Sequence, residues 1–191
     1  PTCYAVVVGG MGCDFIRGAN FGTNILLGES ADILYKKKTD ENEYVALVNA
    51  YPNSSNPGNN VIVGGKAKNY IVGGGGNDLI VGGINAKWNE TSASGITTET
   101  QTINKLYGDF AYFEFDDLLS LTKAKNEDLY DEGGNDVILG SSGNDSIYGG
   151  AGADRIKGGD GNDEIHGGKG NDIIYGGAGN DRIYGEDGVD V

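Results

Sequence analysis

A nine-residue repeat runs without a break through the last third of the chain. From residue 131 onward the units read DEGGNDVIL, GSSGNDSIY, GGAGADRIK, GGDGNDEIH, GGKGNDIIY, GGAGNDRIY and GEDGVDV. Isoleucine follows two positions after the aspartate in each of the first six units. The aspartates are Asp136, Asp145, Asp154, Asp163, Asp172, Asp181 and Asp190. A fixed period of this kind indicates a stack of similar units rather than an ordinary globular core.

Each unit combines a turn with a short strand. Six residues rich in glycine, asparagine and aspartate favour a turn, because glycine allows positive φ and Asn-Asp tolerates left-handed geometry. The other three residues are extended, and the middle one is apolar. One unit cannot bury its isoleucine, so we expect stacked turns of about two units each, with parallel strands and a thin isoleucine core. Loops 18 residues apart then share an edge of the stack.

This stacking predicts two columns of carboxylates. Asp136, Asp154, Asp172 and Asp190 would lie along one edge, and Asp145, Asp163 and Asp181 along the other. Carboxylates at strand spacing repel one another unless a cation lies between them. The chain has 28 acidic and 14 basic residues and a net charge of -14, so cations are its natural partner. Calcium fits, because it takes about six to eight oxygens from carboxylates and from the carbonyls that glycine loops expose.

The repeat resembles the RTX family, whose calcium-binding units have the consensus GGxGxDxUx, with U a large apolar residue. The resemblance implies an all-β fold, a right-handed parallel β-roll (a β-solenoid) with about two nonapeptides per turn. It also implies that aspartates and loop carbonyls of one edge hold each Ca²⁺ between successive loops, which gives about five sites here. The implied carbonyl donors are Gly143, Gly150, Gly152, Gly159, Gly161, Gly168, Gly170, Gly177 and Gly179.

A weaker form of the period extends upstream. The apolar anchors recur nine residues apart at Ile16, Ile25 and Leu34, and again at Ile62, Ile71 and Ile80. We therefore expect one roll over residues 1–191, with degenerate repeats in 1–35 and 59–83 and regular repeats in 131–191.

The aspartate position is only partly kept in these upstream units. Asp14, Asp32 and Asp78 are tentative calcium ligands, and Asp14 and Asp32 are expected to share a site. Thr23, Asn60 and Asn69 stand at the same position elsewhere and put their sites in doubt. Counting the tentative ligands, the chain is expected to bind about eight ions at most, whose charge would roughly match that of the chain.

Two insertions interrupt the expected roll, at residues 36–58 and 84–130. The second holds the only tryptophan, Trp88, and the run FAYFEF, which alternates as a strand would. The segment DDLLSLTKAKNEDL that follows is expected to form a short helix capped by Asp116 or Asp117. The aromatic side chains either pack against the flank of the roll, which is the simpler interpretation, or bind a partner.

The sequence contains no recognisable catalytic motif. His166 is the only histidine, and it follows the anchor Ile165, where a strand side chain points outward. Nucleophile-elbow, paired-histidine and phosphate-binding motifs do not occur. We therefore predict that the chain is not an enzyme. The outward row Tyr148, His166 and Tyr184 either stabilises the exposed strands or binds a partner such as an extracellular polysaccharide.

Charge and hydropathy limit the partners and the compartment. A pI of about 4.3 argues against nucleic acid, and no apolar run approaches the ~18 residues that membrane insertion requires. Extracellular calcium modules bind with dissociation constants of ~0.1 to 1 mM. We therefore expect a secreted or cell-surface protein that is largely unfolded at cytosolic calcium and ordered outside the cell.

The ends of the expected roll are open. The chain stops at Val191, one residue before the anchor of its last unit, and PTCYAVVV leads into the first unit with Val7 at the anchor position. Solenoids normally need capping units. An open head is therefore expected to meet the open tail of another copy and to build an extracellular filament, sheath or matrix. The alternative is a calcium-binding accessory module of a larger secreted enzyme, toxin or adhesin.

Cys3 and Cys13 are the only cysteines and predict a disulfide in an oxidising compartment. If residues 1–8 follow the repeat frame, the two cysteines lie on opposite edges, beyond the ~5.5 Å that a disulfide spans. Either the first strand leaves the frame so that the bond forms within the chain, which we expect, or the bond joins two subunits.

Overall fold

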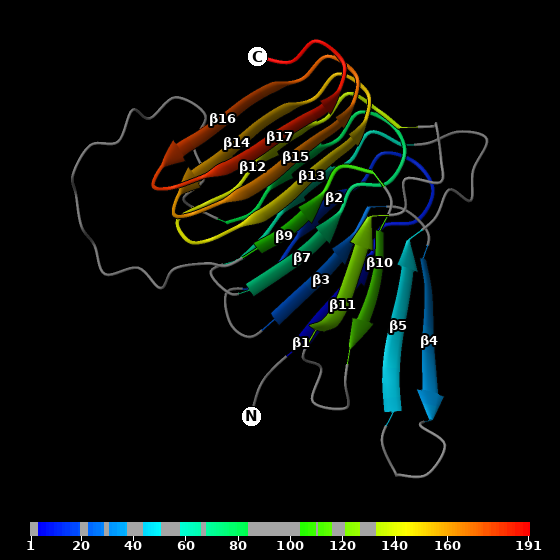
Figure 1. The fold of residues 1–191 in the computed structure, drawn as a ribbon. Helices are drawn as coiled ribbons and strands as arrows, with labels where there is room; N and C mark the ends of the chain where they lie inside the picture. Colours follow the sequence, from blue (N-terminus) through cyan, green and yellow to red (C-terminus); the bar gives the residue numbers. More distant parts are fainter. Residues whose placement is uncertain are drawn as a thin grey trace.

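Two parallel β-sheets, one of seven strands and one of six, form the body of the molecule (Figure 1). The computed structural model describes residues 4–19, 23–28, 31–37, 44–50, 58–65, 68–83, 104–109, 111–115, 121–126 and 133–191. None of these residues is helical, so the described part has no helix that could cross a membrane. The predicted all-β parallel β-roll is confirmed.

The strands of the two sheets alternate along the chain. The seven-stranded sheet contains, in spatial order, β1 (Tyr4–Val8), β3 (Thr23–Leu27), β7 (Lys68–Val72), β9 (Asn104–Tyr107), β13 (Ser146–Ala151), β15 (Glu164–Lys169) and β17 (Arg182–Asp187). The six-stranded sheet contains β2 (Phe15–Arg17), β6 (Val61–Val63), β8 (Leu79–Val81), β12 (Val137–Leu139), β14 (Arg155–Asp160) and β16 (Ile173–Ala178). Each turn of the chain therefore adds one strand to each sheet.

The core is a single row of aliphatic side chains between the sheets. Ile147 pairs with Ile165 in one sheet and Ile138 pairs with Ile156 in the other, so the partner in each sheet is 18 residues away. Burying an isoleucine contributes roughly 1.5–3 kcal/mol. The row contains Ile16, Leu26, Ile62, Ile71, Ile80, Leu106, Ile138, Ile147, Ile156, Ile165 and Ile174.

The first strands keep the repeat frame but shift its phase. Val7 pairs with Leu26, so β1 continues the roll with Val7 in the anchor row. The expectation that this strand leaves the frame to allow a disulfide within the chain is therefore wrong. The anchor of β3 is Leu26 rather than Ile25, and Asn24 rather than Thr23 aligns with Asn69. The cause is the loop from Gly18 to Asn24, which is one residue longer than the equivalent loop from Gly64 to Asn69.

The segment around Leu34 leaves the roll, contrary to the sequence prediction. Residues 31–37 form β4 (Ala31–Lys37), which pairs antiparallel with β5 (Tyr44–Ala50). Asp32 lies opposite Asn49 in this pair and not in a loop of the roll. The expected third degenerate turn, and with it the site shared by Asp14 and Asp32, is therefore wrong.

The expected insertion at 84–130 contains a complete strand of the roll. β9 lies between β7 and β13 in the seven-stranded sheet, with Leu106 aligned to Ile71 and to Ile147. The segment is therefore two insertions, separated by the turn 104–109. Trp88 and Phe110 lie outside the described residues, and the structure describes no side chain of residues 111–115, so the proposed packing of these aromatic groups stays a prediction.

A four-stranded antiparallel sheet joins residues 31–50 to the insertion that follows the turn 104–109. Its order is β11 (Leu121–Asn126), β10 (Ala111–Phe115), β5 and β4. The strand predicted at FAYFEF is present as β10, but β11 replaces the helix that was expected in the segment after it. In Figure 1 the antiparallel sheet projects from one side of the roll.

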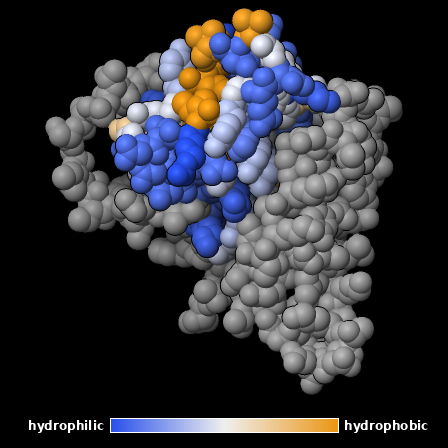
Figure 2. All heavy atoms as spheres, in the orientation of Figure 1, coloured by the Kyte–Doolittle hydropathy of each residue, from blue (hydrophilic) through white to orange (hydrophobic). Residues whose placement is uncertain are grey.

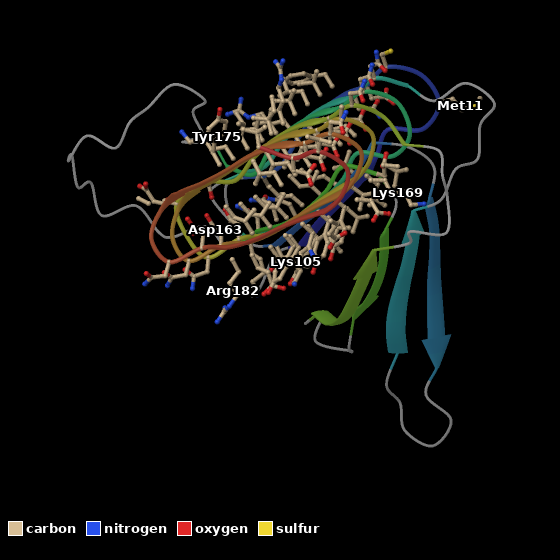
Figure 3. All side chains as sticks on the ribbon, turned by 45° about the horizontal axis from the view of Figure 1, so that its top comes forward. Met11, Lys105, Asp163, Lys169, Tyr175 and Arg182 are labelled. Carbon is tan, nitrogen blue, oxygen red and sulfur yellow. The ribbon has the colours of Figure 1, made fainter. Side chains whose placement is uncertain are left out.

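The turns lie at two edges of the roll, where Asp163 and Lys169 mark opposite edges (Figure 3). Successive turns stack so closely that glycine is required. Gly152 has φ of 127°, and a Cβ at this position would collide with the carbonyl oxygen of Gly134 in the neighbouring turn. An L-residue would therefore meet both backbone strain and a steric clash here.

Candidate metal sites along the two edges of the roll

The structure places the repeat aspartates in two columns, one at each edge. We call these the first edge and the second edge. The first edge carries Asp14, Asn60, Asp78, Asp136, Asp154, Asp172 and Asp190. The second edge carries Asn24, Asn69, Asn104, Asp145, Asp163 and Asp181.

From Asp78 onward, one oxygen of each carboxylate in these columns accepts a backbone N–H of the turn before it. The amide N–H of Asp136 donates to Oδ1 of Asp154 at 2.8 Å, and that of Asp154 donates to Oδ1 of Asp172 at 2.8 Å. The second edge repeats the pattern from Asp145 to Asp163 at 2.8 Å. Each carboxylate is therefore held in a fixed orientation by the turn before it, with Oδ2 turned away from that bond.

The other oxygen is buried without a hydrogen-bond partner along most of the columns. This holds for Oδ2 of Asp14, Asp136, Asp154, Asp163 and Asp172. A buried carboxylate oxygen normally accepts hydrogen bonds or faces a cation, because its desolvation is otherwise uncompensated. We call these atoms the orphaned oxygens. Because the same atom at the same repeat position lacks a partner in several turns, we expect a ligand beside it.

Main-chain oxygens surround these orphaned atoms. A Cβ built on Gly149 would collide with Oδ2 of Asp154 and with the carbonyl oxygen of Gly167, so both oxygens border the same small space. Within the described part of the chain, no three His, Cys, Asp or Glu side chains cluster around one point. An ion here would therefore take carbonyls as well as carboxylates, which is the oxygen-only ligand set that Ca²⁺ accepts and softer metals do not.

The predicted carbonyl donors form columns of their own beside the aspartates. A Cβ on Gly170 would meet the carbonyl oxygen of Gly152, one on Gly168 that of Gly150, and one on Gly177 that of Gly159. The predicted glycines without exception have positive φ: Gly143, Gly150, Gly152, Gly159, Gly161, Gly168, Gly170, Gly177 and Gly179. Their conformation is what brings the carbonyl groups of successive turns into line.

The buried carboxylates are hard to ionise without a cation. Burial raises the pKa of Asp145 and of Asp154 to about 7. Burial, and then the nearby charge of Asp109, raise the pKa of Asp136 to about 10. Desolvation dominates at each of these three positions, so a bound cation would restore the ionised form.

These shifts predict that acid stabilises the calcium-free roll. An aspartate titrates near 3.9 when unfolded but near 7 at Asp145 and Asp154 in the roll. Their stabilising contribution is complete below pH ~4 and is lost as the pH rises through ~7. We expect circular dichroism of the calcium-free chain to gain β signal when the pH falls from about 7.5 to about 5.

Calcium binding is expected to show the opposite dependence, because the ion requires ionised carboxylates. The calcium midpoint for folding should therefore rise as the pH falls. A calcium-free spectrum that is identical at the two pH values would contradict the buried state of these carboxylates.

Asparagine takes over the aspartate position on the second edge of the N-terminal turns. Asn24 Nδ2 donates to Asn69 Oδ1 at 2.7 Å, and Asn69 Nδ2 donates to Asn104 Oδ1 at 2.8 Å. Asn69 Nδ2 also donates to the carbonyl of Gly82 at 2.7 Å. We call Asn24, Asn69 and Asn104 the asparagine ladder. Its amide groups reach neighbouring oxygens by hydrogen bonds, so these turns need no cation on the second edge.

Of the three tentative upstream ligands, Asp14 and Asp78 lie in the roll and Asp32 does not. Asp14 and Asp78 lie on the first edge, with Asn60 between them: Asp14 N–H donates to Asn60 Oδ1 at 2.9 Å, and Asn60 N–H to Asp78 Oδ1 at 2.6 Å. Asp14 therefore has an asparagine neighbour rather than the expected Asp32. This confines carboxylate-to-carboxylate contacts on the first edge to the turns from Asp78 onward.

The turn at 104–109, and with it Asp109, was not predicted from the sequence. The signal was present, because Asn104, Leu106, Tyr107 and Gly108 have the spacing of Asp145, Ile147, Tyr148 and Gly149. It was hidden because asparagine replaces aspartate and long insertions flank the unit. Asp109 is only 6% exposed.

His166 lies in a stack of aromatic rings. Its ring stacks on Tyr148 at 4.7 Å and on Tyr184 at 4.7 Å, and Tyr107 extends the stack beyond Tyr148. Nδ1 lies 2.7 Å from Glu186 Oε1. The ring is therefore held in the outer face of the seven-stranded sheet, as predicted for a strand-stabilising row.

The predicted disulfide involves a residue that the structure does not describe. Cys3 lies outside the described residues, and Cys13 is an exposed free thiol in the first turn of the first edge. The pairing of Cys3 and Cys13 therefore stays a prediction.

Comparison with known proteins agrees with this geometry. The family model described as RTX calcium-binding nonapeptide repeat (4 copies) matches residues 54–86, 130–165 and 157–191. These segments carry Asp78 and the seven regular aspartates. Searches among curated proteins and among solved structures gave no match. The repeats, the parallel roll and the columns of orphaned carboxylate oxygens together place the chain in the family of RTX calcium-binding nonapeptide repeat proteins.

Proposed function

We propose that the chain is a calcium-binding structural protein that folds on Ca²⁺ outside the cell and joins copies of itself end to end. The observation that carries the calcium part is the repeated orphan Oδ2, buried beside a carbonyl of the next turn. The proposed role is not catalytic, since the one histidine is engaged in a ring stack.

The compartment follows from the strength of such sites. Sites built from carboxylates and carbonyls in extracellular modules bind with dissociation constants of ~0.1 to 1 mM. Cytosolic calcium is far below this range, and calcium outside the cell reaches it. The net charge of -14 adds self-repulsion to the calcium-free chain. A secreted or cell-surface location is therefore the one in which this chain would be folded.

The edges of the end strands support self-association. In the described part of the seven-stranded sheet, β17 pairs only with β15 and β1 only with β3. Figure 2 shows apolar atoms at the end of the roll where β16 and β17 lie. In the sheet register, Ile183 would face Val7 of a second copy, and these side chains are 46% and 37% exposed. Pairing β17 with β1 of another copy would satisfy both backbone edges.

The aromatic row favours another copy of the chain over a polysaccharide as the partner. The rings of Tyr107, Tyr148, His166 and Tyr184 lie face to face at 4.7 to 4.9 Å, so their inner faces are covered. A polysaccharide would need an open ring face, and only the outer face of Tyr184 remains beyond the stack. We therefore place an extracellular polysaccharide second to another copy of the chain as partner.

Light scattering and electron microscopy test the assembly. Calcium is used at about 2 mM, which is above the dissociation constants expected for the weakest sites. We expect the mass to grow with protein concentration and elongated particles to appear. Ile183→Lys should prevent this growth, because a charge would be buried at the joint. Leu79→Lys, on the flank of the six-stranded sheet and 37% exposed, is the matched control and should assemble normally.

Monomers at every concentration would overturn the assembly proposal. If those monomers still fold on calcium, the calcium function stands. The alternative role, an accessory calcium-binding module of a larger secreted enzyme, toxin or adhesin, would then be the better description.

A further inference from the structure

One turn on the first edge is split by an insertion and differs chemically from the turns after it. Residues 108 and 109 begin the turn and residues 133–136 complete it, so residues 110–132 are inserted between its second and third positions. Tyr107 aligns with Tyr148, so Gly108 corresponds to Gly149 and Asp109 to Gly150. An acidic residue therefore stands where the next turn has a glycine.

The side chain of Asp109 holds the two parts of this split turn and the next turn together. Oδ1 accepts the N–H of Gly134 at 3.2 Å, across the insertion point. Oδ2 accepts the N–H of Ala151 at 2.6 Å, in the following turn. With 6% of the residue exposed, this carboxylate is buried among backbone groups.

A second buried carboxylate belongs to the same split turn. Asp136 is 1% exposed, and its Oδ2 has no hydrogen-bond partner. A Cβ on Gly108 would collide with this Oδ2 and with the carbonyl oxygen of Gly149, and a Cβ on Gly133 with Oδ2 of Asp109 and the carbonyl oxygen of Ala151. Two carboxylates and two carbonyls therefore line the interface between the split turn and the next one.

We propose that Asp109 makes the calcium site of the split turn a distinct site, with one carboxylate more than the regular repeat sites and a correspondingly higher affinity. The inference rests on the proposed calcium function and goes beyond it. Affinity for Ca²⁺ rises with the number of charged ligands and with the rigidity of the site. Asp109 adds a charge, and its two backbone hydrogen bonds fix the added oxygens in place.

The site would also control the antiparallel sheet. β10 begins at Ala111, two residues after Asp109, so an ion at this position ties the start of the inserted sheet to the roll. As the calcium concentration rises, the split turn would bind its ion and order first. The regular turns of residues 140–191 would follow at higher concentration.

A purely structural role for Asp109 is the competing explanation. In the second edge, the N–H of Asp160 donates to the carbonyl oxygen of Ser141 at 2.9 Å, which is the backbone form of the bond that Ala151 makes to Asp109. The carboxylate could thus stand in for a carbonyl in the ladder. An asparagine side chain at this position would keep an acceptor oxygen but lose the charge, so the Asp109→Asn variant separates the two roles.

Equilibrium dialysis of the full chain against calcium from about 1 µM to about 10 mM tests the proposal. For the unchanged chain we expect one site that binds about tenfold more tightly than the others. Asp109→Asn should lose this tight site and keep the remaining binding curve. Asp187→Asn, an exposed acidic residue in the last turn, is the matched control and should keep the tight site.

Circular dichroism at saturating calcium checks that each variant folds. If Asp109→Asn does not fold, Asp109→Gly decides, because glycine restores the regular turn; it should bring the tight site down to the affinity of the others. A single affinity class in the unchanged chain, or a tight site that survives in the folded Asn or Gly variant, would overturn the proposal. If the unchanged chain binds no calcium at all, the proposed function itself fails.

Discussion

Removing calcium is expected to unfold the turns of residues 133–191. Their columns contain five aspartates that are at most 2% exposed, Asp136, Asp145, Asp154, Asp163 and Asp172. Breaking a buried charge pair by removing one partner costs about 3–5 kcal/mol, and a whole domain is stable by only about 5–15 kcal/mol. The loss of a few ions therefore exceeds the available stability. Folding and calcium binding become one equilibrium.

Circular dichroism and hydrogen exchange measure this effect. The β signal should fall when a chelator is added and return when calcium is restored in excess. Magnesium at equal concentration is the control, because it demands near-octahedral geometry and keeps its water, and should restore little signal. A spectrum that is unchanged by chelation would rule out calcium-dependent folding.

Hydrogen exchange should also separate the two halves of the roll. The asparagine ladder links Asn24, Asn69 and Asn104 without an ion. Amides of β3 and β7 are therefore expected to keep more protection after chelation than amides of β15 and β17. Uniform loss of protection along the chain would show that the ladder does not replace calcium.

Gly149→Ala is expected to block one calcium site by filling the space beside it. The added methyl group would collide with Oδ2 of Asp154 and with the carbonyl oxygen of Gly167. We expect the calcium midpoint for folding to rise by about tenfold, through the loss of these ligand positions and the stacking they require. A calcium titration followed by circular dichroism measures the midpoint.

Gly12→Ala is a control that strains the backbone without filling a ligand space, whereas Gly149 does not have positive φ and its substitution adds no such strain. Gly12 has φ of 102°, and nothing lies within 4 Å of a Cβ at this position. This change should cost only about 1 kcal/mol from the unfavourable φ, with little change in calcium affinity. Equal midpoints for the two variants would show that the filled ligand space beside Gly149 does not control calcium affinity.

The regular turns could be predicted from the sequence because their period is local and unbroken. A turn of six residues followed by a strand of three determines which side chains share an edge, and this is why Asp154 and Asp172 align as expected. The same frame placed Val7 of β1 at an anchor position, although the expected disulfide within the chain favoured a strand that leaves the frame. This placement needed only the position of Val7 relative to the first anchor.

The upstream part was harder because the loops, unlike the strands, can change length. One additional residue between Gly18 and Asn24 moved the anchor from Ile25 to Leu26, which a fixed period could not show. The pairing of β5 with β10 joins segments that are more than sixty residues apart. Strand β11 carries the lysine-rich sequence LTKAKN and forms through its partner β10 rather than through local propensity. Such contacts leave no short-range pattern in one sequence.

The split turns have a consequence for engineering. Two segments are inserted into turns of the first edge, residues 29–57 between Gly28 and Gly58, and residues 110–132 between Asp109 and Gly133. The strands beside them stay in register, because the N–H of Gly28 donates to the carbonyl of Val72 and that of Gly108 to the carbonyl of Tyr148. A turn of this scaffold can thus be interrupted by an insertion as long as the spacing of the strands is kept. A foreign domain whose ends lie close together could be mounted at the Asp109–Gly133 junction, and calcium would then switch its attachment between loose and rigid.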